Sequence, residues 1–355
     1  MGNIKAIAIH LPQFHPFAEN DEWWGRGFTE WTNVARAKPL YKGHYQPHLP
    51  SDLGYYDLRL EESRIAQAEL AKEYGIYGFC YYHYWFNGKR IMNAPIDGIL
   101  ASGKPDFPFM LCWANETWSR RWLGEEKEVL IKQDYGPEDS YNHAKWLCDK
   151  VFIDKRYITI HGRPAFMIYR PHDLPDYKQT IAIFKEVALK AGLPEPFMIA
   201  SNSHSHNLEG FDQVMNFQPQ LSLLKNAFKD HSSLSKFVQN RKLGVNSASL
   251  KVYDYSAVKR IMAAVKLNYK FFPCVFVGWD NTARRGKNGI IIANQNKADF
   301  KQSLIEAKNI VKDNPADEQI VFINAWNEWA EGNHLEPDHK SGHEYLEAVK
   351  EVFNG

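Results

Sequence analysis

The chain of 355 residues is long enough to bury a large core and suits one α/β barrel with insertions, so we expect a single domain over residues 1–355. Its 43 Lys and Arg residues balance 42 Asp and Glu residues, which leaves no strong field for nucleic acid or an anionic membrane, so we expect neither as a partner. Aromatic residues make up 14% of the chain, with 11 Trp, which indicates either rings that line a ligand groove or a heavily aromatic core.

The first residues, 1–14, enter a strand-like alternation at once and lack the apolar stretch and cleavage site of a signal peptide. No apolar run in the sequence approaches the roughly 18 residues of a membrane span. We therefore expect a cytoplasmic protein without a membrane span. A periplasmic or secreted chain whose signal peptide had been removed would show the same pattern.

Eight short runs rich in apolar and β-branched or aromatic residues follow one another along the chain. Continuous apolar runs of this length are typical of strands buried on both faces. We therefore predict one strand of a parallel sheet in each run. In chain order the runs are residues 4–10, 76–86, 107–118, 163–170, 196–205, 211–219, 271–280 and 319–329.

Segments with helical spacing lie between most of these runs, at 59–75, 177–192, 256–269 and 298–313. Strand alternating with helix predicts a parallel sheet, and eight rounds predict a closed (β/α)₈ TIM barrel of the α/β class. An open doubly wound sheet is the alternative. It is disfavoured because no G-x-G-x-x-G or G-x-x-x-x-G-K-[ST] motif follows any predicted strand.

Two connections are far longer than an ordinary barrel loop. The first runs over 11–57 and is dense in Trp, Tyr and His, as expected of a lid or groove wall over the barrel mouth, or of a brace packed on the barrel. The second fills roughly 220–254, where a brace and a lid are equally consistent with the composition. The four Cys residues show no C-x-x-C pair, and we interpret them as buried free thiols.

Functional groups of a TIM barrel lie at the carboxyl ends of its strands. Nearly every predicted strand changes there from aliphatic residues to aromatic residues with an amide, acid or imidazole. Rings that cover the C–H face of a sugar, with polar groups for its hydroxyls, would make carbohydrate the ligand; buried interfacial aromatics are the alternative. The predicted substrate-binding residues are His10, Tyr81, His83, Trp113, Asn115, Glu116, Trp118, His204, Trp279, Asp280 and Trp326.

The stretch "NAWNEWAEGNHLEP" places Glu328 and Glu331 three residues apart, just after the eighth predicted strand. Cleavage of a glycosidic bond needs one carboxyl group to protonate the leaving oxygen and a second group to act as base or nucleophile. We predict that Glu328 and Glu331 are this catalytic pair. Glu336 is a weaker candidate, because an acid before Pro337 also suits a loop or a helix start.

Several long motifs resemble those of the glycoside hydrolase family 99-like proteins, the group also labelled WbsX: "AIHLPQFHP", "WWGRGFTEWTNV", "YGFCYYHYWFNGKR", "FMLCWANETWSRRW", "FVGWDNTARR" and "WNEWAEGNHLEPD". The resemblance spans almost the whole chain and implies a (β/α)₈ fold related to endo-acting α-mannosidases and α-mannanases. It implies that Glu328 deprotonates the sugar's own 2-hydroxyl, through an epoxide-like intermediate with retention, and that Glu331 is the acid and later the base. It implies no metal and no organic cofactor.

Two other enzyme mechanisms remain open from the residues. In one, Glu116 is the acid/base and Glu328 the covalent nucleophile of a retaining glycosidase. In the other, the protein is a glycosyltransferase of surface-polysaccharide biosynthesis, for which the spacing of Glu328 and Glu336 matches an E-x₇-E pattern, although no D-x-D triplet or Gly-rich phosphate loop accompanies it. A sugar-binding barrel without catalysis is disfavoured by the paired glutamates.

Two further patterns suggest other ligands. His204 and His206 alternate onto one strand face and would suit zinc, but no partner ligands are evident at other strand ends, so we expect no metal site. Four arginines after strand ends would suit an anionic sugar, although arginines at such positions are common on surfaces. They are Arg120, Arg121, Arg284 and Arg285.

Overall fold

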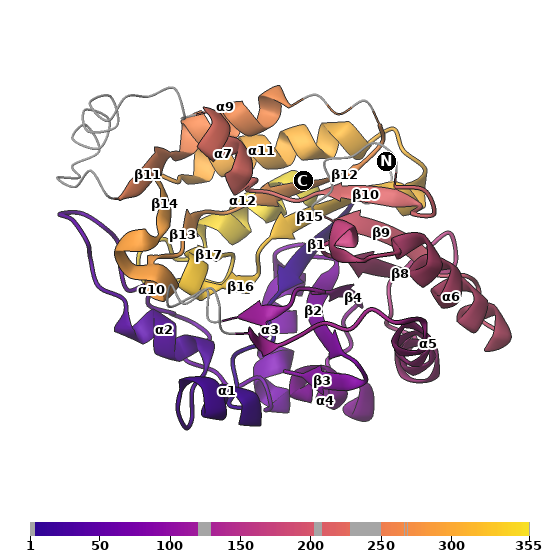
Figure 1. Cartoon of the computed structure of the whole chain (residues 1–355). Helices are drawn as coiled ribbons and strands as arrows, with labels where there is room; N and C mark the ends of the chain where they lie inside the picture. The colour runs from indigo at the N-terminus through magenta and orange to yellow at the C-terminus, as the bar shows by residue number, and fades with distance from the viewer. Residues whose placement is uncertain are drawn as a thin grey trace.

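The computed structural model describes residues 4–119, 129–201, 208–227, 250–265, 267 and 269–354. Eight parallel strands of these residues pair in a ring that closes between β1 and β2, which confirms the predicted barrel (Figure 1). Each strand lies within one predicted run. They are β1 (Lys5–His10), β2 (Gly78–Phe86), β4 (Phe109–Trp113), β8 (Arg163–Ile168), β9 (Phe197–Ser201), β10 (Gln213–Asn216), β12 (Phe272–Phe276) and β15 (Ile320–Asn324).

Helices surround the barrel (Figure 1), and the four predicted segments are helical. These are α3 (Glu61–Glu73), α6 (Tyr177–Lys190), α9 (Tyr255–Ala264) and α11 (Lys297–Val311). The structure adds helices that the sequence analysis did not identify. Among them are α4 (Ala94–Ser102), α5 (Pro137–Trp146), which continues into the π-helical turn η2 (Leu147–Val151), and α12 (Glu344–Phe353).

Short strands outside the barrel form small sheets at its rim. β11 (Lys251–Asp254), β14 (Ile290–Ala293) and β13 (Trp279–Asp280) form a three-stranded sheet. The remaining short strands pair with one neighbour each. They are β3 (Lys89–Ile91) with β2, β7 (Thr159–Ile160) with β8, β5 (Trp118–Ser119) with β6 (Val129–Ile131), and β16 (Asn327–Glu328) with β17 (Asn333–His334).

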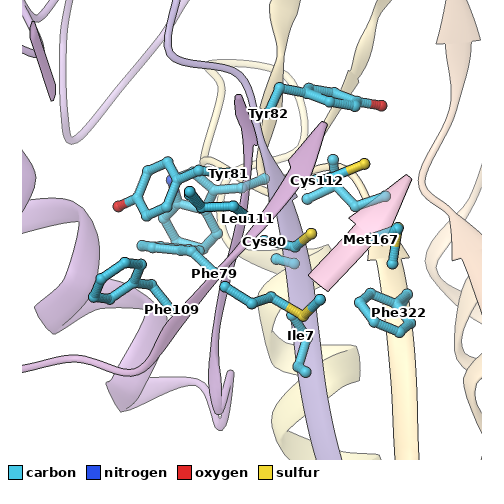
Figure 2. Packing of buried hydrophobic residues seen from close by; sticks show 14 of the residues in the cluster. Ile7, Phe79, Cys80, Tyr81, Tyr82, Phe109, Leu111, Cys112, Met167 and Phe322 are labelled. Carbon is cyan, nitrogen blue, oxygen red and sulfur yellow. The ribbon is translucent and has the colours of Figure 1, made fainter. Parts of the chain in front are cut away.

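Side chains alternate across each barrel strand, and both sides are buried. Figure 2 shows Phe79 and Tyr81 of β2 on one side of the strands and Cys80 and Cys112 on the other. The first set packs toward the surrounding helices and the second toward the barrel interior. All four cysteines are free and buried, which confirms that interpretation.

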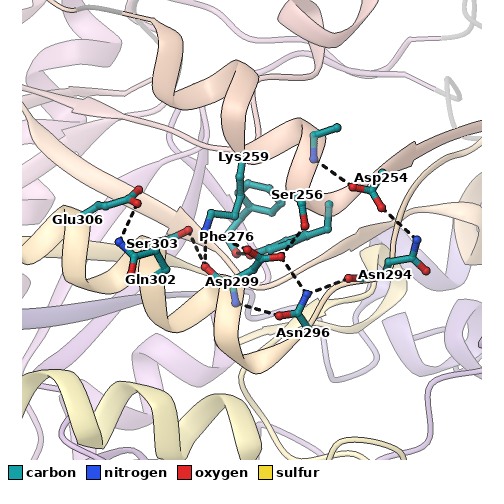
Figure 3. Close-up of polar contacts among 12 residues, drawn as sticks. Asp254, Ser256, Lys259, Phe276, Asn294, Asn296, Asp299, Gln302, Ser303 and Glu306 are labelled. Carbon is teal, nitrogen blue, oxygen red and sulfur yellow. Dashed lines mark hydrogen bonds and ion pairs between the residues drawn. The ribbon is translucent and has the colours of Figure 1, made fainter.

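The N-termini of α9 and α11 share one network of polar contacts (Figure 3). The Asp254 carboxylate accepts from the backbone N–H of Ala257, and the Asn296 side chain accepts from that of Asp299, so each helix has a capping residue. The Ser256 hydroxyl of α9 then donates to the Asp299 carboxylate of α11 at 2.6 Å. Two neighbouring helices on the outside of the barrel are thereby fixed to each other at the ends where they begin.

The first long connection forms α1 (Ala18–Trp24) and α2 (Glu30–Arg36), which lie over the mouth of the barrel. Helix α2 contacts α10 (Thr282–Arg285) and the 3₁₀ turn η6 (Trp329–Glu331), which follow two other barrel strands. The connection also braces the barrel, because Gln46 donates to Asp280 after β12 and the Tyr56 hydroxyl donates to Glu336 after β17. Of the second long connection the structure describes α7 (Leu221–Ala227) and β11. No helix in the described ranges has the length and apolar character needed to cross a bilayer.

Candidate active site

A pocket of about 290 Å³ opens at the mouth of the barrel, at the carboxyl ends of the strands. Its walls come from strand ends, from the first long connection and from the segments after β12 and β15. The aromatic lining residues are Trp24, Phe28, Tyr82, Tyr84, Trp118, Tyr169, Phe217 and Trp279. The polar and charged lining residues are Gln13, Glu30, Asn33, Arg36, Glu116, Arg284, Asn324, Glu328 and Glu331.

Glu328 and Glu331 reach the pocket on a tight hairpin that follows β15. Strand β16 pairs with β17, and the turn η6 joins them, so Glu328 ends one strand and Glu331 ends the turn. Gly332 closes the hairpin with a φ of 57°, and a Cβ there would lie 3.0 Å from that of Asp280. Glycine therefore permits both the left-handed backbone and the close packing that hold the two acids in place.

Two asparagines fix the hairpin to the barrel. The Asn327 side chain accepts from the backbone N–H of Leu11 and donates to its carbonyl, which ties β16 to the end of β1. The Asn333 side chain accepts from the backbone N–H groups of Val277 and Gly278, which ties β17 to the end of β12. Both asparagines are fully buried, so the positions of the catalytic candidates are set by rigid barrel strands.

One guanidinium group connects three carboxylates in the pocket wall. Arg284 donates from Nη1 to Glu331 at 2.6 Å and from Nη2 to Glu328 at 3.1 Å. Its Nε donates to Glu30 of helix α2 at 2.7 Å. The side chains of Arg284 and Glu331 are 10% and 13% exposed, so these contacts are shielded from bulk water. Arg284 therefore sets the relative positions of the two predicted catalytic groups.

Burial controls the protonation of the pair. Loss of hydration on burial raises the pKa of Glu328 to about 8, and Glu331 adds to this rise while Arg284 opposes it. Burial likewise raises the pKa of Glu331 above its ordinary value, again opposed by Arg284. Since three acids share one arginine, the pair retains a proton near neutral pH. One carboxyl group can then donate a proton while the other accepts one.

Three of the predicted substrate-binding residues line the pocket beside the acids: Glu116, Trp118 and Trp279. Glu116 accepts from Arg170 Nη1 at 2.8 Å, and both side chains are about two-fifths exposed. The Trp118 ring packs edge-on against Tyr84, and both rings face the pocket. These residues therefore lie where a bound ligand would meet them.

Five other predicted residues do not line the pocket: four lie on the opposite side of their strands, and Trp326 lies between β15 and β16. They are His10, Tyr81, His83, Trp113 and Trp326. His10 contacts Gln67 of α3 at 3.1 Å, and His83 stacks on Trp146 of α5. The reason is the alternation of the strand, because Tyr82 and Tyr84 of β2 face the pocket and the residues between them face the helices.

Asn115 and Asp280 lie behind the pocket lining as well. The Asn115 side chain exchanges two hydrogen bonds with the backbone of Arg170. Asp280 accepts from Gln46 at 2.9 Å and lies 2.6 Å from His44, so it joins the first long connection to the segment after β12. Both residues support the wall of the pocket. His204, with His206, Arg120 and Arg121, lies outside the described residues.

Glu336 is buried but does not line the pocket. Its carboxyl oxygens accept from Trp329 Nε1 at 2.5 Å, Gln67 Nε2 at 2.6 Å and the Tyr56 hydroxyl at 2.8 Å. Burial raises its pKa to about 7, and the three donors oppose the rise. Glu336 is therefore bound by its own neighbours, beneath the hairpin that carries the acid pair.

The sequence analysis missed several lining residues, of which Glu30 and Arg284 matter most. Arg284 appeared there as a surface arginine for an anionic sugar, whereas the structure shows its donors bound to three glutamates. Glu30 lies in the first long connection, 254 residues from its partner. No local pattern signals such a contact. Tyr82 and Tyr84 were detectable, because they alternate with two residues that were predicted.

Comparison with known proteins gives one family model and two relatives. The family model described as "Glycosyltransferase WbsX" matches residues 6–349. The "Uncharacterized protein WxcX" of Xanthomonas campestris pv. campestris is 38% identical over 352 residues in each of two strains. The match covers 98% of this chain and 49% of each relative, so the chain spans about half the length of the curated relatives it matches.

Solved structures share the fold. One, described as "Glycoside hydrolase-like protein", superimposes with a TM-score of 0.60 at 14% identity, over 99% of this chain and 94% of that one. The GH99 endo-alpha-mannosidase from Bacteroides thetaiotaomicron gives a TM-score of 0.54 at 13% identity, over 98% of this chain and 96% of that one. These likenesses establish a common barrel architecture along nearly the full length of the chain.

Proposed function

The chain belongs to the WbsX family, and from its pocket we propose that it is a glycoside hydrolase that cleaves an oligosaccharide or polysaccharide. The single observation that supports this most is the pair Glu328, which is buried, and Glu331, which is 13% exposed, both lining the pocket and both bound to Arg284. Paired carboxyl groups that hold a shared proton are what acid-assisted cleavage of a glycosidic bond requires.

The walls of the pocket support a sugar as the ligand. Eight aromatic residues line it, and their faces can cover the C–H surfaces of successive sugar rings. Burial raises the pKa values of Tyr82 and Tyr84 well above the ordinary value, so both remain phenols that can donate to sugar hydroxyls. Carboxylates, amides and Arg36 provide the remaining polar contacts. We infer that the substrate is a chain of neutral sugars.

For the two acids we propose the reaction that the resemblance to the glycoside hydrolase family 99-like proteins implies. Glu328 removes the proton of the sugar 2-hydroxyl, whose oxygen attacks C1 while Glu331 protonates the leaving glycosidic oxygen. Glu331 then deprotonates a water molecule that opens the epoxide-like intermediate at C1, and the 2-oxygen regains its proton from Glu328. Two displacements at C1 give net retention of configuration. This reaction needs the proton of the pair on Glu331 and an ionised Glu328. Burial raises the pKa of Glu328 to about 8 in the free protein, so the proton must pass from Glu328 to Glu331 when substrate binds.

An α-linked, mannoside-like glycan is the substrate class that we favour. The structural neighbour from Bacteroides thetaiotaomicron is an endo-alpha-mannosidase, and it shares the barrel over nearly its full length. Its low identity means that the choice of sugar rests on likeness of fold. The aromatic residues Trp24 and Phe28, from the first long connection, line the same pocket.

A glycosyltransferase is the second candidate, favoured by the printed description of the matching family model. It would form a glycosidic bond in the same pocket from an activated sugar donor. The spacing of Glu328 and Glu336 does not support it, because Glu336 lies outside the pocket and is bound by Tyr56, Gln67 and Trp329. Calorimetric titration with nucleoside diphosphate sugars tests this candidate, and tight binding would favour it.

The experiment that tests the hydrolase is a panel of α-mannans and bacterial surface polysaccharides incubated with the purified protein. We expect new reducing ends on at least one glycan, measured by a reducing-sugar assay and by mass spectrometry of the oligosaccharides. Glu328→Gln serves as the matched control, because it keeps the volume of the side chain and removes its acid. Equal release by this variant would show that the activity arises elsewhere.

A further inference from the structure

Three residues on the side of the hairpin away from the pocket bring their donor atoms together. His48 comes from the first long connection, His334 from β17, and Asp338 from the segment that follows β17. Each residue has one possible metal-ligand atom, and these three atoms all lie within 4.8 Å of one another. His48 Nδ1 lies 2.8 Å from His334 Nε2, and Asp338 Oδ2 lies 3.9 and 3.8 Å from these nitrogens. All three side chains are buried, and none lines the pocket.

One hydrogen bond already joins the two histidines, because His48 Nδ1 donates to His334 Nε2 at 2.8 Å, and a metal ion would replace the proton of this bond. His334 Nδ1 lies 2.9 Å from the carbonyl oxygen of Glu336 and donates to it, which leaves the lone pair of Nε2 directed at the cluster. Asp338 Oδ1 accepts from the backbone N–H groups of Lys340 and Ser341, which leaves Oδ2 facing the two histidines. Outer hydrogen bonds of this kind orient the ligands in metal sites.

The dimensions suit a small transition-metal ion. Imidazole and carboxylate ligands bind zinc at about 2.0–2.2 Å, which places tetrahedral ligand atoms roughly 3.3 Å apart. Asp338 Oδ2 lies 3.9 and 3.8 Å from the two nitrogens, near this value, whereas the nitrogens are hydrogen-bonded at 2.8 Å and would move apart by roughly half an ångström to bind one ion. Two imidazoles and one carboxylate are softer ligands than magnesium or calcium prefers. A fourth, non-protein ligand would complete the shell.

We propose that His48, His334 and Asp338 form a structural site for a divalent transition-metal ion, with zinc as the ion that this ligand set fits best. The ion cross-links the first long connection to the hairpin of Glu328 and Glu331. Backbone hydrogen bonds already join these segments, from Ser51 to Pro337 and from His339 to Leu49. The proposal does not depend on which glycosidic reaction the pocket performs.

The test uses the full chain after treatment with EDTA and removal of the chelator. Isothermal titration with zinc chloride is expected to show one site, and differential scanning fluorimetry is expected to show a higher Tm with zinc. Magnesium chloride is expected to cause neither change. His48→Ala and Asp338→Asn are each expected to weaken zinc binding at least about tenfold. His339→Ala, which removes an exposed imidazole next to Asp338, is the matched control and is expected to bind zinc like the unaltered protein.

Asp338→Asn keeps an oxygen for the Lys340 and Ser341 backbone donors, so it is expected to fold even if His48→Ala does not. Circular dichroism checks this. The proposal is overturned if the stripped protein binds no zinc. It is equally overturned if folded Asp338→Asn binds zinc as tightly as His339→Ala does, because the ion would then be held elsewhere.

Discussion

The hairpin after β15 presents two kinds of buried glutamate within a few residues of each other. Glu328 and Glu331 face the pocket and share one cation, Arg284. Glu336 faces the protein interior, where three uncharged groups donate to it. Burial raises the pKa of all three, yet one side of the hairpin is accessible to a ligand and the other is filled. A shifted pKa alone therefore does not identify a catalytic acid.

The three carboxyl groups differ in their hydrogen-bond partners and in their access to the pocket. Glu336 uses both oxygens to accept hydrogen bonds from side chains of the protein, so its contribution is to stability. Glu328 and Glu331 are held by a guanidinium that also binds Glu30, and they border an open cavity. Substitution of Glu328 or Glu331 should therefore lower activity, whereas substitution of Glu336 should lower stability.

Glu331→Gln and Glu328→Gln should each lower kcat on the cleaved glycan by about 10³-fold, since each removes one partner in proton transfer. The unfolding midpoint should not fall, because neither carboxyl group is needed to satisfy a buried donor other than Arg284. Steady-state kinetics and thermal unfolding measure the two effects. Glu186→Gln, an exposed glutamate of α6, is the control and should leave kcat unchanged. If Glu328→Gln and Glu331→Gln both kept a kcat within tenfold of the unaltered enzyme, neither glutamate would be a catalytic residue.

Glu336→Ala should lower the free energy of unfolding by roughly 3–5 kcal/mol, because it leaves the donors of Tyr56, Gln67 and Trp329 without their acceptor. Chemical denaturation measures the loss. Glu336→Gln, which retains one acceptor oxygen, should lose less. If Glu336→Ala instead kept full stability and lost catalysis, Glu336 would belong with the acid pair.

Arg284→Met should lower kcat/KM by roughly 10- to 100-fold and move the pH profile to higher pH. Arg284 lowers the pKa values of Glu328 and Glu331, so its removal raises both, and the singly protonated pair then exists at higher pH. In the unaltered enzyme the descending limb should lie near pH 8, where the pair loses its last proton. Arg284→Lys keeps the charge and should shift the profile less. An unmoved profile in Arg284→Met would show that Arg284 does not tune the pair.

The smallest effect concerns stability and pH. Folding raises the pKa of Glu328 from its ordinary 4.5 to about 8, so its contribution to stability is lost as pH rises between these values. Glu328→Gln cannot ionise and should gain stability relative to the unaltered protein over that window, by on the order of 1–3 kcal/mol at pH 8. Denaturation curves at pH 5 and pH 8 check the trend. A constant difference between the two proteins would mean that Glu328 is ionised throughout.

The eight strands were predictable from the sequence because each is a short apolar run between polar segments. The side of the strand on which a residue lies was not. A barrel strand is buried on its inner face by other strands and on its outer face by helices, so alternation carries no polar signal. Tyr81 and His83 were therefore chosen where Tyr82 and Tyr84 line the pocket.

The place of Glu328 and Glu331 beside the pocket was predictable for a different reason. Glu328 and Glu331 follow the last strand directly, and the end of a barrel strand fixes where they go. Their partners Arg284 and Glu30 come from other connections. Arg284 is 44 residues from Glu328 along the chain and 254 residues from Glu30. Such pairings depend on the folded arrangement of loops. The grouping of His48, His334 and Asp338 was not predictable from the sequence for the same reason, and the metal site that we propose there departs from the sequence expectation of none.

The most direct measurement compares the cleaved glycan with an activated aryl glycoside of the same sugar, whose leaving group needs no proton. We expect Glu331→Gln to regain most of its activity on the aryl glycoside and Glu328→Gln to remain inactive on both substrates. The contrary result, recovery by Glu116→Gln with Glu331→Gln inactive on both, would make Glu116 the acid and would contradict the account of the paired glutamates.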